Sequence, residues 1–250
     1  MALSTSFARR IAMQMRKGCQ FFSVSANGKP QIVHETDALL LKSLPVTPFA
    51  MNQYLLGCKE TKEAVLIDCG DDQPQRWVDA AEEENMKITQ ILQTHGHVDH
   101  VSGLKQTREL LGEDVPIVAC PEDWSIFKSA PAQGLMFGMS CPMPPAIDVD
   151  VNEGDTVNIG NLEVAVLHTP GHSPGHIAFH ITSEKVLVSG DLVFQGSIGR
   201  TDFPGCNQED MNKSLARLKT MDRDTLIFPG HMGITSIGIE CDSNPFLLQL

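Results

Sequence analysis

The chain has 250 residues, a formal net charge of −12 and an apolar content of 42%. This length suits one domain or two small ones, and the apolar content is enough for a sizeable buried core. No run of 18 apolar residues occurs, so the sequence excludes a membrane span, and a chain this acidic is a poor partner for nucleic acid or for anionic lipid surfaces.

The N-terminal segment differs in charge from the rest of the chain. Residues 1–34 contain no Asp or Glu but carry Arg9, Arg10, Arg16, Lys17 and Lys29. An acid-free, Arg-bearing, Ser-containing N-terminus is typical of an organelle transit peptide, and a disordered basic tail is the alternative. We therefore expect the catalytic domain to span residues 35–250. The expected destination is the mitochondrial matrix, with plastid and cytoplasm as alternatives.

The first half of this domain alternates between predicted strands and helices. The β-branched run at 64–68 ends in a Cys-Gly-Asp-Asp turn, and 74–86 has the pattern of a helix. A strand at 88–93 leads directly into Thr-His-Gly-His. A second helix over 99–111 stops at Gly112, and 115–119 is again a strand. Cys69 and Cys120 are expected to pack in the core on strands. The odd count of seven cysteines, with no C-x-x-C pair, argues against a disulfide framework and a zinc ribbon.

Consecutive strands dominate from residue 162 onward. They are predicted at 162–167, 177–181, 185–189 and 225–228. One amphipathic helix is expected over 207–221, with Met211, Leu215 and Leu218 on its apolar face. Two sheets sandwiched between outer helices, an α/β fold, fit this order of elements.

Candidate functional side chains follow the predicted strands. His95, His172, Asp191 and His231 each come just after the end of one strand. Loops at the carboxyl ends of strands are where a rigid scaffold can bring side chains together. We therefore expect these four residues to meet at one site.

The sequence from His95 to His100, which follows Thr94, concentrates three imidazoles and a carboxylate in six residues. In a strand-to-helix turn, His95 and His97 lie on the same side of an extended segment, and Asp99 and His100 lie one helical step farther on. The two pairs can therefore face adjacent points. Imidazole and carboxylate ligands together suit zinc, iron or manganese. With the later residues they make enough ligands for two metal sites that remain open for chemistry: His95, His97, Asp99, His100, His172, Asp191 and His231.

The remaining histidines are not expected to be ligands. His34 falls in the leader and His180 in a strand. His168 and His176 flank the turn at His172, where either of them could fix the tautomer of a ligand or could serve only a structural role.

These motifs resemble the metallo-β-lactamase superfamily. The resemblance rests on T-H-x-H-x-D-H at 94–100, Pro-Gly-His at 170–172, Gly-Asp at 190–191 and Pro-Gly-His at 229–231. It covers roughly residues 40–250 in the same order and implies an αββα sandwich of two mixed β-sheets flanked by helices. The resemblance further implies that one metal is held by His95, His97 and His172, that the other is held by Asp99, His100 and His231, and that Asp191 bridges both.

Three shorter stretches are similar to the short bacterial-type branch of the glyoxalase II family, the hydroxyacylglutathione hydrolase-like enzymes. They are QGLMFG at 133–138, GSIGRTDFPG at 196–205 and NPFL at 244–247. Two departures stand out. Only 19 residues follow His231, where larger members carry a glutathione-binding helical domain, and Met232 stands where the family usually has Gly.

This second resemblance implies hydrolysis of S-(2-hydroxyacyl)glutathione to glutathione and a 2-hydroxy acid, a step of methylglyoxal detoxification. It implies two divalent metal ions, with zinc expected and iron or manganese as alternatives. A metal-bridging hydroxide, positioned by Asp99 and Asp191, would attack the thioester carbonyl. Arg200 is the candidate for binding a glutathione carboxylate, and an internal contact with Asp202 or with the backbone is its alternative role.

Several other functions compete with this hydrolase. Mononuclear iron persulfide dioxygenases of sulfide metabolism also resemble the chain, share the Gly-Arg-Thr-Asp-Phe run, and use positions matching His95, His172 and Asp191. The net charge of −12 argues against a nucleic-acid hydrolase, and the complete ligand set argues against a non-catalytic relative. The lack of a Gly-x-Ser-x-Gly elbow, and of a histidine near Cys206 in the sequence, argues against covalent catalysis.

Overall fold

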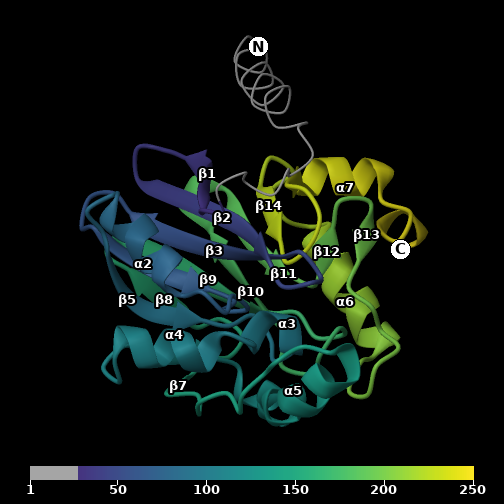
Figure 1. Cartoon of the computed structure of the whole chain (residues 1–250). Helices are drawn as coiled ribbons and strands as arrows, with labels where there is room; N and C mark the ends of the chain where they lie inside the picture. The colour runs from purple at the N-terminus through teal and green to yellow at the C-terminus, as the bar shows by residue number, and fades with distance from the viewer. Residues whose placement is uncertain (1–27) are drawn as a thin grey trace.

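Two β-sheets lie face to face, with helices on both outer faces (Figure 1). This is the αββα sandwich that the motifs implied. The computed structural model describes residues 28–250, so the expected transit peptide falls largely outside the described residues. In the part that is described, no helix combines the length and the hydropathy needed to cross a bilayer.

The first sheet has seven strands, which lie side by side in chain order. Its first four strands pair antiparallel and its last four pair parallel, with β4 shared. The strands are β1 (Gln31–Glu35), β2 (Leu39–Val46), β3 (Met51–Cys58), β4 (Glu63–Ile67), β5 (Lys87–Leu92), β6 (Ile117–Ala119) and β7 (Val149–Asp150).

The second sheet has six strands and is antiparallel except where β11 pairs with β14. In spatial order they are β15 (Thr235–Ser236), β14 (Leu226–Pro229), β11 (Val186–Gly190), β10 (Ile177–Ile181), β9 (Leu162–His168) and β8 (Thr156–Ile159). A separate small hairpin, β12 (Val193–Phe194) and β13 (Ser197–Ile198), follows β11.

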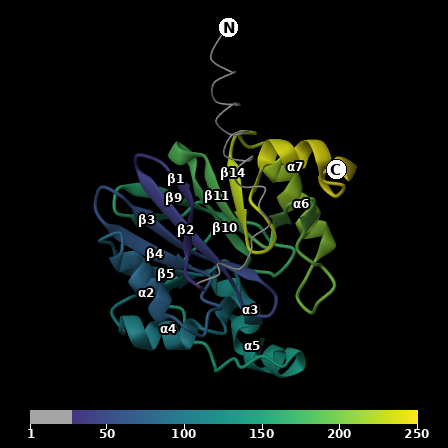
Figure 2. The ribbon, with the colours of Figure 1, turned by 45° about the horizontal axis from the view of Figure 1, so that its top comes forward.

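Each outer face is covered by its own set of helices, as two views of the ribbon show (Figures 1 and 2). On the first sheet these are α2 (Gln75–Glu82), α3 (Val98–Val101), α4 (Leu104–Leu111) and α5 (Trp124–Phe137). On the second sheet they are α6 (Gln208–Leu218) and α7 (Ile237–Ser243), and short 3₁₀ turns occur at Pro121–Asp123, Thr182–Glu184 and Leu247–Gln249. Met211, Leu215 and Leu218 pack together against the second sheet, as the helical pattern predicted.

The main core lies between the two sheets and explains why the central strands are apolar on both faces. In β4, Val65 and Ile67 face the other sheet, whereas Ala64 and Leu66 lie under the helices. Successive side chains of a strand point to opposite faces, so a strand buried on both sides shows a continuous apolar run. Cys69 and Cys120 are buried as expected, although both lie just beyond their strands, β4 and β6.

Strand β1 corrects the expected domain boundary at residue 35. Gln31 pairs with Ser43 of β2, and Val33 packs against the core between the sheets. Residues 31–34 therefore belong to the domain rather than to the leader. Sequence alone did not indicate this strand because it lies at the edge of the sheet, where Gln31 and Ile32 are exposed and the apolar signal is weak.

The helix predicted over 99–111 is two helices, α3 and α4, separated at Ser102 and Gly103. Gly103 donates its N–H to the carbonyl of Cys69, and a Cβ at this position would collide with the backbone of Asp71. This close approach of two backbones is the reason for the break. The helix predicted over 74–86 is likewise shorter, because α2 ends at Glu82 and Asn85 turns the chain with a φ of 57°.

Candidate metal centre

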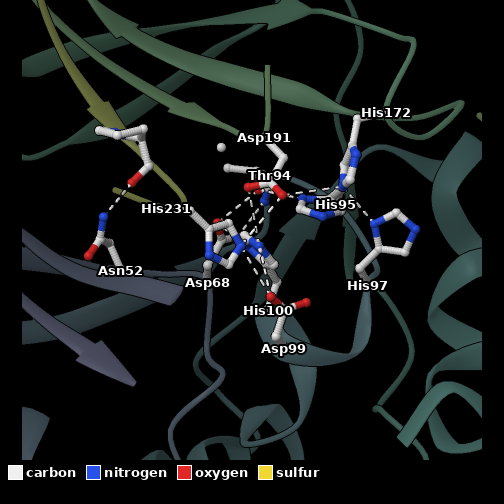
Figure 3. A network of polar contacts seen from close by, with 12 residues as sticks. Asn52, Asp68, Thr94, His95, His97, Asp99, His100, His172, Asp191 and His231 are labelled. Carbon is white, nitrogen blue, oxygen red and sulfur yellow. Dashed lines mark hydrogen bonds and ion pairs between the residues drawn. The ribbon is translucent and has the colours of Figure 1, made fainter. Parts of the chain in front are cut away.

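All seven candidate ligands meet at one end of the sandwich (Figure 3). The first sheet contributes His95 and His97 after β5, and then Asp99 and His100 from the short helix α3. The second sheet contributes His172 after β9, Asp191 after β11 and His231 after β14. The structure thus brings together side chains that follow strand ends of both sheets.

One group consists of three histidines, His95, His97 and His172. Their ligand atoms lie within 4.8 Å of one another, and Nδ1 of His97 lies 2.8 Å from Nε2 of His172. The rings of His95 and His97 are perpendicular within 10°, with an interplanar angle of 82°. Three imidazole nitrogens this close together could hold one metal ion and leave a further position open for a water or a substrate.

A second group consists of Asp99, His100 and His231, whose ligand atoms also lie within 4.8 Å of one another. Oδ2 of Asp99 is 3.2 Å from Nε2 of His231 and 3.9 Å from Nε2 of His100. This group mixes carboxylate with imidazole, a ligand set that suits several divalent ions.

Asp191 stands between the two groups. Its Oδ2 lies 3.3 Å from Nε2 of His172 and 3.6 Å from Nε2 of His231. Its Oδ1 lies 3.4 Å from Nε2 of His100. One carboxylate therefore faces residues of both groups, which is the position that a bridging ligand needs.

Three buried polar atoms at the centre have no hydrogen-bond partner among the described residues: Nε2 of His95, Nε2 of His100 and Oδ1 of Asp191. Buried polar atoms are nearly always paired, because leaving one unpaired costs free energy. A divalent cation at each group would satisfy all three atoms. The residues present thus fit a pair of metal ions.

Two imidazoles of the three-histidine group, those of His95 and His97, resist protonation and are therefore ready for metal ligation. Burial lowers the pKa of His97 to about 3, and the positive charge that His172 would carry contributes to the shift. Burial also holds the pKa of His95 well below its ordinary value. Neutral imidazole is the form that binds a metal, so His95 and His97 can ligate over the whole physiological pH range.

For Asp191 and for His100 of the second group, by contrast, neighbouring charges outweigh the effect of burial on the pKa. Burial opposes ionisation of Asp191, but His231 and His100 outweigh it and hold the pKa of that carboxyl well below its usual range. Burial likewise opposes protonation of His100, and the carboxylates of Asp191, Asp99 and Asp68 outweigh it and raise the pKa of its imidazole. A metal that binds here takes the place of imidazole protons, so binding must release them.

Asp68 contacts the ring nitrogen of His100 that faces away from the centre. The sequence did not indicate this residue. It is buried at the end of β4, accepts hydrogen bonds from Thr94 N–H and Thr94 Oγ1 at 2.8 Å each, and lies 2.9 Å from Nδ1 of His100. It therefore turns Nε2 of His100 toward the centre. Its φ of 61° is unusual for a residue other than glycine. The available signal is an acid at the end of an apolar run, and the pattern at 64–68 predicts only a strand residue there.

Backbone carbonyls orient two further ligands. Nδ1 of His172 donates to the carbonyl of Arg200 at 2.9 Å, and Nδ1 of His231 donates to the carbonyl of Phe49 at 3.2 Å. A carbonyl can only accept, so both rings carry their proton on Nδ1 and present Nε2 to the centre.

His176 is placed to position Asp191. Its Nε2 accepts the backbone N–H of Asp191 at 2.9 Å, and its Nδ1 lies 2.8 Å from Oγ1 of Thr169. It thus acts on the backbone of a candidate ligand and not on the ring of another histidine. His168 instead donates to the carbonyl of Pro174 at 2.8 Å and fixes no ligand.

Asp123, at the start of α5, is a second residue that sequence reasoning missed. It is fully buried and accepts hydrogen bonds from Gly96 N–H at 2.7 Å and from Gly175 N–H at 2.8 Å. It therefore joins the loop of His95 and His97 to the loop of His172. No pattern in the sequence indicates this role, because both partners are backbone amides of distant segments.

Arg200 makes the internal contact that was one of its two expected roles. Its Nε and Nη2 donate to the two carboxylate oxygens of Asp202 at 2.7 and 2.8 Å, and its guanidinium stacks on Phe203 at 3.4 Å. Met232, which replaces the usual Gly after His231, has a φ of 66°. That backbone conformation explains why glycine suits the position.

Comparison with known proteins agrees with this geometry. Residues 46–231 match the family described as the metallo-beta-lactamase superfamily. The hydroxyacylglutathione hydrolase GloC of Haemophilus influenzae is 36% identical over 214 residues, which cover 83% of this chain and 97% of that protein.

Two solved structures are similar in both sequence and fold. A crystal structure of TTHA1623 in a di-iron-bound form is 35% identical, has a TM-score of 0.74 and covers 82% of this chain and 99% of its own. ETHE1 from Myxococcus xanthus is 30% identical, has a TM-score of 0.68 and covers 82% of this chain and 83% of its own. With its two sheets, its His/Asp centre and these likenesses, the chain belongs to the metallo-β-lactamase superfamily.

Proposed function

We propose that this protein is a binuclear metal-dependent hydrolase that cleaves the thioester S-(2-hydroxyacyl)glutathione to glutathione and a 2-hydroxy acid. The observation that carries the proposal is the completeness of both ligand groups, with Asp191 facing each of them. The likeness to a protein named hydroxyacylglutathione hydrolase supports the choice of substrate.

We assign one ion to His95, His97 and His172, the other to Asp99, His100 and His231, and the bridge to Asp191. Zinc is the ion we propose. Iron is the first alternative, because a solved relative is di-iron-bound, and manganese is the second. When bound, two such ions lower the pKa of a shared water and stabilise the negative charge that develops on the substrate.

The chain's own residues orient the reactants. Asp99 and Asp191 are carboxylates at the centre with depressed pKa values, because nearby histidines outweigh the effect of burial. They can accept hydrogen bonds from the attacking water and direct it at the thioester carbonyl. The leaving thiolate is a weak base, so no strong general acid is needed. Arg200, about half exposed, is our candidate for a glutathione carboxylate, which would replace Asp202 as its partner.

The test counts metals per chain and offers S-lactoylglutathione and glutathione persulfide in separate assays with an oxygen electrode. We expect about two metals and loss of thioester without oxygen uptake. His231→Ala should lower thioester hydrolysis roughly 100-fold, since it removes a ligand outright, whereas the matched His168→Ala should change it little. One iron per chain, with oxygen uptake on the persulfide and an intact thioester, would instead establish the persulfide dioxygenase.

We also propose that the acid-free N-terminal residues direct the protein to the mitochondrial matrix. Arg9, Arg10, Arg16 and Lys17 support this reading. Residues 1–30 fused to a fluorescent protein should co-localise with a matrix marker, and replacing the three arginines with glutamate should abolish that. A cytoplasmic or plastid signal from the unaltered fusion would overturn the proposal.

A further inference from the structure

Three phenylalanines from separate parts of the chain meet beside the metal centre. Phe49 lies in the turn between β2 and β3, Phe137 ends α5, and Phe203 lies in the loop before α6. The ring centroids of Phe49 and Phe137 are 5.3 Å apart, and those of Phe137 and Phe203 are 6.2 Å apart. Phe203 in turn lies 6.3 Å from the ring of His97. We call Phe49, Phe137 and Phe203 the aromatic wall.

The aromatic wall is open to solvent although it is apolar. Phe49 is 42% exposed and Phe137 is 40% exposed, and the neighbouring Met136 is 78% exposed. Single exposed apolar residues need no explanation, but contiguous apolar surface on a protein usually marks a binding site. Because the wall continues directly to His97, the bound group must be part of a molecule that also reaches the metal centre.

The loops that build the metal centre also hold the wall. The turn that carries Phe49 is strained, with φ of 62° at Thr47 and 53° at Ala50, and its Phe49 carbonyl accepts the hydrogen bond of His231. Strain of this kind persists where the surroundings impose it and gathers at functional sites. Oε1 of Gln133, on α5, accepts the N–H of Val98 at 3.2 Å, so the helix carrying Phe137 is fixed to α3.

The wall ends in a charged group at Phe203, the member nearest to His97. The guanidinium of Arg200 covers the ring of Phe203 at 3.4 Å, so a charged group and an apolar surface adjoin each other at the centre. A glutathione thioester has the same division, with carboxylates on its peptide and an acyl group of variable polarity on its sulfur. The charged peptide matches Arg200, which leaves the acyl group to the rings.

We propose that the aromatic wall binds the acyl group of the substrate, and that the enzyme therefore prefers 2-hydroxyacyl thioesters with aromatic or bulky aliphatic side chains over the lactoyl thioester. Phe137 is the specificity-determining residue, because its ring contacts both other members of the wall. This inference rests on the proposed thioester hydrolysis.

The first experiment compares kcat/KM for S-mandeloylglutathione, whose acyl group carries a phenyl ring, with that for S-lactoylglutathione. We expect the mandeloyl thioester to be favoured about 10-fold, the range that a hydrophobic pocket provides. Phe137→Ala should bring the ratio close to one, because it should lower kcat/KM for the mandeloyl thioester far more than kcat/KM for the lactoyl thioester. Leu135→Ala is the matched control, since Leu135 lies on the same helix and is 85% exposed.

The second experiment measures binding without hydrolysis. Calorimetry with S-benzylglutathione and S-methylglutathione, which are thioethers and cannot be cleaved, should show tighter binding of the benzyl compound, and Phe137→Ala should remove the difference. A benzyl preference in a protein that cleaves no thioester would retain the aromatic wall and overturn the proposed function. Equal rates on both thioesters, with no effect of Phe137→Ala in either experiment, would overturn the inference alone.

Discussion

His100 shows how neighbouring carboxylates prepare a single metal ligand. Asp68 lies 2.9 Å behind its ring at Nδ1, and Asp191 lies 3.4 Å in front of it at Nε2. A carboxylate behind a ligating imidazole fixes its orientation and raises its basicity. The two acids therefore have different roles. Asp68 acts through His100, whereas Asp191 faces both ligand groups directly.

These roles predict different outcomes for two alanine variants. Asp191→Ala should lower occupancy of both sites together, because the loss leaves two cations without a shared anion. Asp68→Ala should weaken only the site that contains His100, by roughly 10–100-fold. Metal titrations of purified protein, with the exposed Asp79→Ala on α2 as control, measure both effects. Full occupancy of both sites in Asp191→Ala would show that this residue is not the bridge.

The sequence indicated the candidate ligands but not the residues that hold them in place. His95, His97, Asp99 and His100 stand in one compact motif, and the other three candidates each follow a strand. Asp68 and Asp123 have no such signal, because their partners are a remote ring and remote backbone amides. Only the folded arrangement brings these partners within hydrogen-bond distance.

Among the secondary-structure elements, apolar patterning predicted the central strands well. It predicted poorly the strand at the edge of a sheet and the helix that contains Pro and Gly. Strand β10 has the bounds that the sequence indicated, because alternation is strong where a strand is buried. Helix α5 was missed because it contains Pro131 and Gly134, which ordinarily indicate a loop. Strand β1 was missed because the edge of a sheet requires little apolar surface.

Strand β1 provides a test of the corrected domain boundary. A chain that begins at residue 36 lacks β1 and exposes the edge of β2, so its melting temperature should fall relative to a chain that begins at residue 28, by roughly 2–4 °C for each kcal/mol of stability lost. The comparison isolates residues 28–35, which comprise β1 and the three residues before it, because both chains lack residues 1–27. Differential scanning calorimetry measures the difference. Equal melting temperatures would mean that β1 contributes nothing to stability.

For the molecule as a whole, the metal centre joins the two halves of the sandwich. The first sheet supplies four of the seven candidate ligands, His95, His97, Asp99 and His100, and the second sheet supplies His172, Asp191 and His231. The order of predicted elements indicated this layered architecture. The strand ends indicated that the candidate ligands meet at one site, but not how the ligands are divided between the sheets, because sequence order alone does not assign each strand to a sheet.

Metal removal should therefore destabilise the whole domain and not one loop. A ligand present at about 1,000 times its dissociation constant stabilises the folded state by about 4 kcal/mol. Chelation should lower the melting temperature in a single cooperative transition, and added zinc should restore it. The variant Asp191→Ala should respond much less to chelator than the unaltered protein. If the chelated protein melted at the same temperature as the metal-bound protein, the metal centre would not stabilise the packing of the two sheets.

The division of candidate ligands between the sheets also sets the order in which the ligands are synthesised. The four ligands of the first sheet lie within residues 95–100 and leave the ribosome together, whereas the last of the other three is His231. The histidine-rich segment 95–100 is therefore available to bind a metal ion before the remaining candidate ligands have been synthesised. We therefore expect the affinity of the nascent chain for metal to rise in stages, as His172, Asp191 and finally His231 are added to the four earlier candidate ligands.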